Sequence, residues 1–535
     1  MTKHLVILFL AILPLAQSQT PTTVGFDRPM AEHLLNRAGF GGTPEDCDRL
    51  VALGLEGAVD HILSARAGES AALPRFEPTV LGRPGRAAIR DRISPDLSKQ
   101  EREEALRKFR QEFRRKDRRQ ITAYRAWWMQ RLLDTPAPLQ ERMVLFWHGH
   151  FTSGYRDVRN SYHLIRQNQL FRKHALGNFK TLLHAVSKDP AMLEYLDNNR
   201  NRRGRPNENF AREVMELFTL GAGNYTEKDI KEAARAFTGW TFRGNEFFYE
   251  MRRHDFGKKT VLGVTARLRG ERVLDILLAQ DAAPRWVAGK LLRHFLGTDP
   301  DDAMLARYAG ILRQQDWEIR PFLQSLFTDP AFYDGTVVGG RILGPVELLV
   351  GVCRRLGEHP PGALLANVAT LLGQELMQPP DVKGWDGGAA WITTSTFLAR
   401  GNFAGYLVEG ISPRKLFQDF MRDAPAGKDD KKQPPPERMK GANRKMDRTF
   451  RGVARARYTP RVRLRSFIRK ATSAETVVDI LCDRLLAVPV TVEARAGLVH
   501  FLRGEEPAAN FRMPDERRLK RLARLILSLP EAQIG

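Results

Sequence analysis

Cysteine is scarce in this chain: only three of its 535 residues are cysteines, Cys47, Cys353 and Cys482. Three thiols cannot form a disulfide framework, and they exclude any zinc or iron–sulfur site that needs four thiolates. The three residues lie far apart, each on a stretch with helical periodicity, so at most one disulfide is possible. We expect buried free thiols instead.

Long apolar segments and common catalytic motifs are also missing. After the first twenty residues, no stretch approaches the roughly 18 uncharged apolar residues of a membrane-spanning helix. The sequence contains no glycine-rich phosphate loop, nucleophile elbow, zincin helix or haem-attachment motif. A mechanism based on a nucleophilic serine or cysteine therefore has no motif to support it.

The first residues have the pattern of a secretory signal peptide. Lys3 and His4 form a short basic start, and Leu5–Leu15 form an apolar run that is too short to span a bilayer. Ala16 and Ser18 supply the small residues that precede a cleavage site. We predict cleavage near Ser18 and a mature protein that is periplasmic or secreted. An uncleaved membrane anchor is the alternative.

Positive charge is abundant: 85 Lys and Arg against 62 Asp and Glu give a net charge of +23. Residues 427–470 carry +12 of this, residues 83–119 carry +7, and residues 200–205 carry +4, which leaves the rest of the chain neutral. Such charge bears on association with anionic partners and not on the fold. Because export would separate the protein from cytosolic DNA, we rank nucleic acid last among these partners.

These tracts divide the chain. After a signal peptide over residues 1–18, we expect a main helical domain over 19–421, in which 83–119 is a charged helical insertion. The mixed charges of 83–119 are more typical of a solvated helix with i,i+4 ion pairs than of a binding surface. Residues 422–470, with the run Pro434–Pro436, are predicted to be a basic linker, and residues 471–535 a C-terminal helical segment packed on the main domain.

Helical periodicity dominates the remaining sequence. Thr43-Pro44 and Thr226 are typical of helix N-termini. The clearest strand pattern is 240–252, where apolar residues alternate beyond a predicted turn at Gly244-Asn245. We therefore predict a mainly α fold, with a multi-helical body, one small β-hairpin and the C-terminal helical segment.

His148 and His150 close a helix that is predicted to begin near Pro136. Residues two apart on a regular helix point about 200° away from each other. The two imidazoles could therefore share a metal ion only if the helix ended at Gly149 and the chain became extended. The alternative is a pair of hydrogen-bonded histidines beneath the aromatic residues of 146–151.

Carboxylates follow in two further segments. Glu213 lies with Asn209 and Glu216 on a helical stripe about 90° from the apolar stripe, where a carboxylate can bind a metal or transfer a proton. His254 and Asp255 leave the predicted hairpin toward a glycine turn, a position that can present a metal ligand and a general base. Both patterns also occur in ordinary ion-paired helices and loops.

The last candidate is the loop 379–391, which contains Trp385 and Trp391 and is followed by Arg400 and Asn402. Its prolines and glycines favour an irregular loop that displays the two indole rings. Such rings can stack on sugars or other flat ligands, which makes these four residues candidates for ligand binding. Tryptophans that simply pack a loop onto the core are the commoner arrangement.

In their order and spacing these segments resemble the bacterial family DUF1800. The tracts that carry the resemblance are His33–Gly41, Phe146–Phe151, Asn207–Gly221, Tyr225–Trp240, His254–Gly263 and Pro379–Trp391. The resemblance extends from about residue 29 to the last residues, with 83–119 and 427–470 as apparent insertions. It implies an exported, mainly helical protein without a settled activity, and it transfers no catalytic residue. It also suggests a partner, since genes of this family often lie beside those of exported sulfatase-like or phosphatase-like proteins.

Two functions are consistent with these patterns. The first is a metal-dependent enzyme that acts on an envelope or extracellular polymer, with His148, His150 and His254 as ligands. Glu213 would be a fourth ligand or general base, and Asp255 a second catalytic candidate. Such a ligand set would suit zinc, copper or iron. The alternative is a non-catalytic binding or assembly protein that serves the sulfatase-like or phosphatase-like partner, or docks on an anionic envelope surface or glycan.

Overall fold

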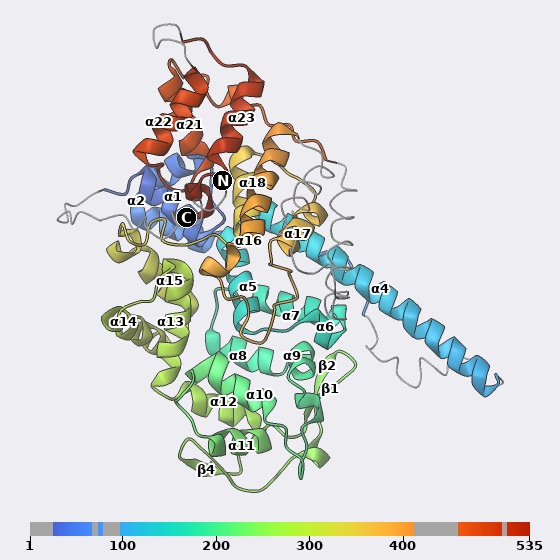
Figure 1. Cartoon of the computed structure of the whole chain (residues 1–535). Helices are drawn as coiled ribbons and strands as arrows, with labels where there is room; N and C mark the ends of the chain where they lie inside the picture. Colours follow the sequence, from blue (N-terminus) through green and yellow to red (C-terminus); the bar gives the residue numbers. More distant parts are fainter. Residues whose placement is uncertain (1–24, 67–72, 79–96, 411–457, 505–510) are drawn as a thin grey trace, which may run out of the picture.

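The computed structural model describes residues 25–66, 73–78, 97–410, 458–504 and 511–535 (Figure 1). The predicted signal peptide, residues 83–96 of the predicted insertion and residues 422–457 of the predicted linker lie outside these ranges. Helices dominate the described residues, whose strands form two small antiparallel hairpins. The prediction of a mainly α fold is confirmed. Among the described helices, none combines the length and the apolar character needed to cross a membrane.

The described helices fall into two groups along the chain, one before and one after the hairpins. The first group consists of α1 (Arg28–Ala38), α2 (Pro44–Ser64), α4 (Lys99–Asp134), α5 (Pro138–His150), α6 (Tyr155–Val158), α7 (Ser161–Lys173), α8 (Phe179–Ser187), α9 (Pro190–Tyr195), α10 (Asn209–Glu213) and α11 (Glu227–Ala236). After the hairpins come α12 (Gly270–Leu278), α13 (Ala282–Leu296), α14 (Asp302–Gln314), α15 (Ile319–Phe327), α16 (Pro345–Leu356), α17 (Gly362–Leu371), α18 (Thr394–Glu409), α21 (Ala474–Leu485), α22 (Val492–Arg503) and α23 (Glu516–Ile526).

Shorter helical turns and the strands complete the fold. The turns are η3 (Asn198–Arg200), the π-helix η4 (Val214–Leu220), η5 (Met251–Arg253), η6 (Pro330–Tyr333), η7 (Gly388–Trp391), η9 (Leu464–Ser466) and η11 (Pro530–Gln533). Strand β1 (Trp240–Arg243) pairs with β2 (Glu246–Tyr249), and β3 (Lys259–Val261) pairs with β4 (Val264–Ala266). The β1–β2 turn lies at Gly244-Asn245, as predicted. The second hairpin was not predicted, because its strands are only three residues long.

Helix caps explain several of the predicted helix starts. The side chain of Thr43 accepts a hydrogen bond from the backbone N–H of Asp46 at the start of α2, and Asp46 bonds back to Thr43. Thr226 and Asp229 make the same reciprocal pair at the start of α11. These capping boxes satisfy amide groups that have no partner within the helix, which is why the local sequence predicts both starts.

The long helix α4 has two different halves. Its C-terminal half carries an apolar stripe, Ile121, Tyr124, Trp128 and Leu132, that is buried against the body. Its N-terminal half extends beyond the other described helices (Figure 1). This half carries the i,i+4 ion pairs Lys108–Glu104 at 3.0 Å and Lys116–Glu112 at 3.5 Å. Residues 99–119 lie in the charged part of α4, whereas the fully buried apolar stripe lies in its C-terminal half. That 83–119 is an insertion stays a prediction.

A buried carboxylate holds the base of α4 in place. Glu141 of α5 has no exposed surface, and it accepts hydrogen bonds from Trp128 and Arg131 of α4 and from Arg172 of α7. The Nε and Nη2 atoms of Arg172 lie 2.6 and 2.8 Å from its two oxygens. Burial would raise the pKa of Glu141, but the two guanidinium groups outweigh it and lower the pKa. The carboxylate is therefore ionised and joins three helices.

The C-terminal helices pack on the main body. Helix α21 contacts α16, and α23 contacts α18 (Figure 1). The described end of the predicted linker also contacts the body, since Tyr458 donates to the carboxylate of Glu358 and the backbone N–H of Arg461 donates to it at 2.8 Å. All three cysteines are free and buried, as expected.

The close contact between α17 and α4 leads to a stability prediction. A Cβ atom at Gly362 would lie 2.0 Å from the carbonyl oxygen of Ala126, so only glycine fits there. We expect Gly362→Ala to lower the free energy of unfolding by about 2–3 kcal/mol, measured by urea denaturation. The control is Gly310→Ala in α14, where a Cβ atom would meet nothing within 4 Å. It should change the stability by less than about 1 kcal/mol. Equal effects of the two substitutions would contradict this packing.

Candidate functional site

The structure separates His148 from His150. Helix α5 continues through Gly149 to His150, and its cap is the N–H of Phe151, which donates to the carbonyl of Trp147. The condition under which the two imidazoles could converge, an end of the helix at Gly149, is therefore not met. Because both histidines lie on regular helix, their side chains point to different sides of α5.

The surroundings of the two rings differ accordingly. The His148 ring lies 5.6 Å from the rings of Trp128 and Trp385, measured between centroids. The Nε2 atom of His150 donates to the carbonyl oxygen of Phe218 at 3.2 Å. Burial lowers the pKa of each imidazole to about 3, helped by Arg125 near His148 and by Lys290 near His150. Both rings are neutral parts of an aromatic core.

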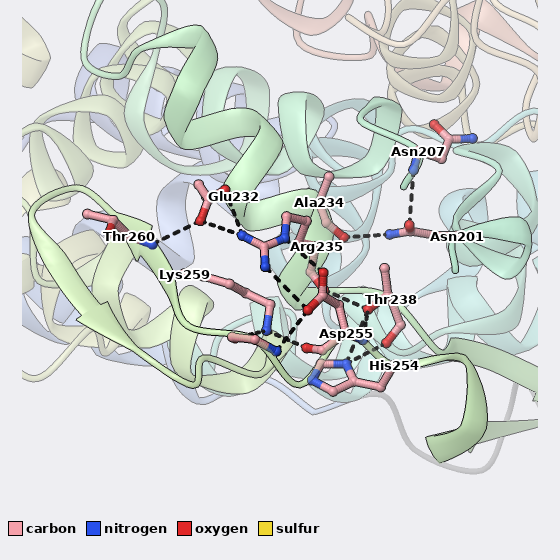
Figure 2. A network of polar contacts seen from close by, with 11 residues as sticks. Asn201, Asn207, Glu232, Ala234, Arg235, Thr238, His254, Asp255, Lys259 and Thr260 are labelled. Carbon is pink, nitrogen blue, oxygen red and sulfur yellow. Dashed lines mark hydrogen bonds and ion pairs between the residues drawn. The ribbon is translucent and has the colours of Figure 1, made fainter. Parts of the chain in front are cut away.

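His254 and Asp255 belong to a third environment, which Figure 2 shows. The Nδ1 atom of His254 donates to the carbonyl of Thr238 at 2.9 Å, and the backbone N–H of Asp255 donates to the Thr238 hydroxyl at 2.8 Å. The Asp255 carboxylate accepts a bond of 2.8 Å from Nε of Arg235, which lowers its pKa. Arg235 also bonds Glu232. These contacts attach the segment after β2 to α11.

The structure shows no cluster of metal ligands around these three histidines. In the described ranges no group of three or more His, Cys, Asp and Glu could hold a metal ion, and His148 and His150 point to different sides of one helix. The sequence placed these residues between 146 and 260 at the ends of regular elements, but the direction of each side chain depends on tertiary packing. The arrangement gives the expected metal-dependent enzyme no shared imidazole ligand set.

Glu213 lies where α10 passes into the π-helix η4, a local widening of the helix that often marks functional positions. Burial and the neighbouring carboxylate of Glu216 raise the pKa of Glu213, while Arg212 and Lys383 oppose the rise. Glu216 accepts a hydrogen bond from the hydroxyl of Tyr225 at 2.8 Å. The structure thus places Glu213 near the loop 379–391, and its catalytic role stays a prediction.

Most residues of the loop 379–391 are exposed, but its two tryptophans are half-buried and contact the body. Trp385 lies against His148, and Gly384 is so close to α5 that a Cβ atom there would lie 2.6 Å from the carbonyl oxygen of Gly149. Arg400 is only 2% exposed and donates to the carbonyl of Leu343 at 3.0 Å. Trp391 lies beside Gly344, the residue that follows Leu343 in the chain. Asn402 has its Nδ2 atom buried in the same helix, α18, and the predicted role of these four residues in ligand binding stays a prediction.

A large groove lies at another place, between the outer half of α4, the turn around α6 and the segment of η3. Its volume is about 1240 Å³. Six arginines from these three segments line it: Arg110, Arg114, Arg118, Arg156, Arg159 and Arg200. Three carboxylates line it as well, Asp117, Asp157 and Glu194. The groove therefore has an excess of positive charge.

Several charges of this basic groove are not neutralised by nearby partners. Asp117 is only 3% exposed and bonds inward, to the hydroxyl of Tyr155 at 2.7 Å and to Ser161 at 2.6 Å. Within the described ranges, Arg110 and Arg114 make no ion pair, whereas Arg156 pairs with Glu375. The sequence identified the charge of 83–119 and 200–205 as separate tracts. It gave no indication that the two tracts line one groove.

Comparison with known proteins identifies the family. A family model described as "Protein of unknown function (DUF1800)" matches residues 33–534, nearly the whole chain. The chain therefore belongs to the DUF1800 family, as its motifs predicted. No curated protein and no solved structure matches it. The family description names no activity, so the function has to be argued from the geometry of the sites.

The buried, neutral state of His148 predicts a pH dependence. Below about pH 6.5 the unfolded chain binds a proton that the folded protein excludes until about pH 3, so the stability falls as the pH falls. In His148→Phe this loss disappears. Relative to wild type, the variant should gain about 2 kcal/mol in unfolding free energy between pH 7.5 and pH 4.5, measured by urea denaturation.

The matched control is His500→Phe, at an exposed position of α22. It should follow the wild-type pH dependence closely. If His148→Phe and His500→Phe show the same pH dependence, His148 is not held neutral by burial, and the description of this core is wrong.

Proposed function

We propose that this DUF1800 protein is a non-catalytic binding protein that acts outside the cytoplasm and holds an acidic polysaccharide chain in the basic groove. The observation that carries the proposal is the convergence of six arginines from three separate segments on one groove. Guanidinium groups present paired N–H donors that match the geometry of sulfate, phosphate and carboxylate groups. An acidic polymer would make several such contacts at once.

The shape of the groove favours a polymer chain over a flat surface. A polysaccharide chain can enter the concave space between the projecting helix α4 and the body. A flat membrane surface would contact only the rim of the groove. Three aromatic residues, Phe113, Tyr155 and Phe242, lie among the arginines in its lining. Aromatic rings pack well on the apolar faces of sugar rings, while the arginines contact the acidic groups.

The net charge of +23 supports the same function at longer range. A concentrated positive field raises the rate of encounter with anionic polymers and makes binding sensitive to salt. The sulfatase-like or phosphatase-like partner suggested by the family resemblance would find ester groups on such a polymer. The signal-peptide pattern supports action in the periplasm or outside the cell.

The metal-dependent enzyme is the weaker of the two functions expected from the sequence. His148, His150 and His254 lie in three different environments: against Trp385, at the carbonyl of Phe218, and at the carbonyl of Thr238. The pKa of Glu213 is raised by burial and by Glu216, and the cations Arg212 and Lys383 oppose this rise. The basic groove therefore supports a binding function better than these residues support catalysis.

A binding experiment with sulfated polysaccharide tests the proposal. Fluorescein-labelled dextran sulfate should bind the wild-type protein in a salt-sensitive way, and neutral dextran should not. Arg110→Gln/Arg114→Gln should weaken the affinity roughly tenfold, because two charged contacts are lost in a partly solvated groove. Fluorescence anisotropy at several salt concentrations measures both effects.

The control is Lys108→Gln/Lys116→Gln, which removes the same charge from the same helix but outside the groove lining. It should lower the affinity far less. Equal losses in the two double variants would contradict a role for the groove. Tighter binding to phosphatidylglycerol vesicles or to a DNA oligonucleotide than to dextran sulfate would contradict the proposed ligand class.

A further inference from the structure

A second concentration of positive charge lies inside the protein, away from the basic groove. It consists of Arg37 from α1, Arg142 from α5 and Arg341 just before α16, together with His294 from α13 and Glu347 from α16. Arg37 and Arg142 are each 1% exposed, and Glu347 is 8% exposed. Arg341 lies at the edge, with 17% of its side chain exposed. We call these five residues the arginine cluster.

The arginine cluster contains one carboxylate, Glu347, and both of its oxygens already have partners. The Oε1 atom of Glu347 lies 3.0 Å from Nη2 of Arg142 and 2.6 Å from Nη2 of Arg341. Its Oε2 atom accepts a bond of 2.9 Å from the backbone N–H of Gly344. The two guanidinium groups lower the pKa of Glu347 far enough to outweigh burial, so it contributes a full negative charge. Three arginines therefore share one counter-charge.

Arg37 has donors that the protein does not satisfy. Its Nη2 atom donates to the carbonyl of Val337 at 2.5 Å, but its Nε and Nη1 atoms are buried and find no acceptor in the described part of the chain. The Nε atom of Arg142 and the Nε2 atom of His294 are in the same situation. Almost all buried polar groups in native proteins have a partner, so four such atoms in one cluster need an explanation.

Electrostatics points in the same direction. Burial lowers the pKa of Arg37 far below its usual range, and the charges of Arg341 and Arg142 lower it further. Burial also lowers the pKa of Arg142 to about 9 against the attraction of Glu347. The C-terminal end of α13 offers partial negative charge at Gly297, which lies against Arg37. This is less than the two unit charges that remain unbalanced.

We propose that the arginine cluster binds one inorganic oxyanion, phosphate or sulfate, between Arg37, Arg142 and His294. Such an ion supplies the missing negative charge and the acceptors for the four unsatisfied donors, and a neutral imidazole can still donate one N–H. The exposed edge of Arg341 gives the route of entry. The bound ion contacts α1, α5 and α13, and the proposal does not depend on the function of the basic groove.

Equilibrium dialysis of the full chain tests this site. The protein is prepared in chloride buffer and dialysed against radiolabelled phosphate or, in a second arm, radiolabelled sulfate. We expect saturable binding of one ion per chain, with competition between the two oxyanions. Arg37→Met should weaken this binding roughly tenfold or more, because it removes one guanidinium but leaves the contacts of Glu347 intact.

The groove variant Arg110→Gln/Arg114→Gln is the matched control and should bind the ion as wild type does. A saturable site that is lost in the groove variant but kept in Arg37→Met would overturn the proposal. So would the absence of saturable binding in the wild-type protein, a result that needs no variant to fold. Where binding is found, the melting temperature of wild type should also rise by about 2 °C at saturating phosphate, and that of Arg37→Met should not.

Discussion

The buried carboxylate of Glu141 fixes the direction of α4, and through it the position of the basic groove. Four N–H donors from two other helices converge on this carboxylate, which has no exposed surface. A buried charge of this kind is tolerated only when its partners are complete, so α4 has little freedom to pivot at its base. The outer half of α4 is held in place by this attachment and by the packing of α17 on the inner half. The anchored inner half of α4 fixes the direction of its charged outer half, and this outer half forms one side of the basic groove.

Positive charge plays two different roles in the molecule. Arginines on the outer half of α4 remain in water, where they cost little and act on partners at a distance. Arginines inside, such as Arg37 and Arg142, have lost their water and must be matched by acceptors and counter-charge. The buried histidines differ from both groups of arginines. Because burial lowers their pKa, His148 and His150 stay neutral and need no counter-charge. The net charge of +23 therefore combines two kinds of residue: arginines on the surface that stay hydrated, and buried arginines that need acceptors and counter-charge.

Local features of the fold could be predicted from the sequence, because they depend on neighbouring residues. The caps at Thr43 and Thr226 and the turn at Gly244-Asn245 are of this kind. The continuation of α5 through Gly149 could not be predicted, since glycine allows either outcome and the aromatic packing around His150 decides it. The basic groove could not be predicted either, because its arginines are brought together by tertiary contacts alone. Membership of the DUF1800 family followed from motifs, which are local as well.

Hydrogen–deuterium exchange of the whole protein, with and without dextran sulfate, tests most directly whether an acidic polymer binds in the groove between α4 and α6. We expect slower exchange of backbone amides in residues 105–119 and 155–160, with little change in α21–α23. Protection confined to the loop 379–391 or to the C-terminal helices would contradict binding in this groove.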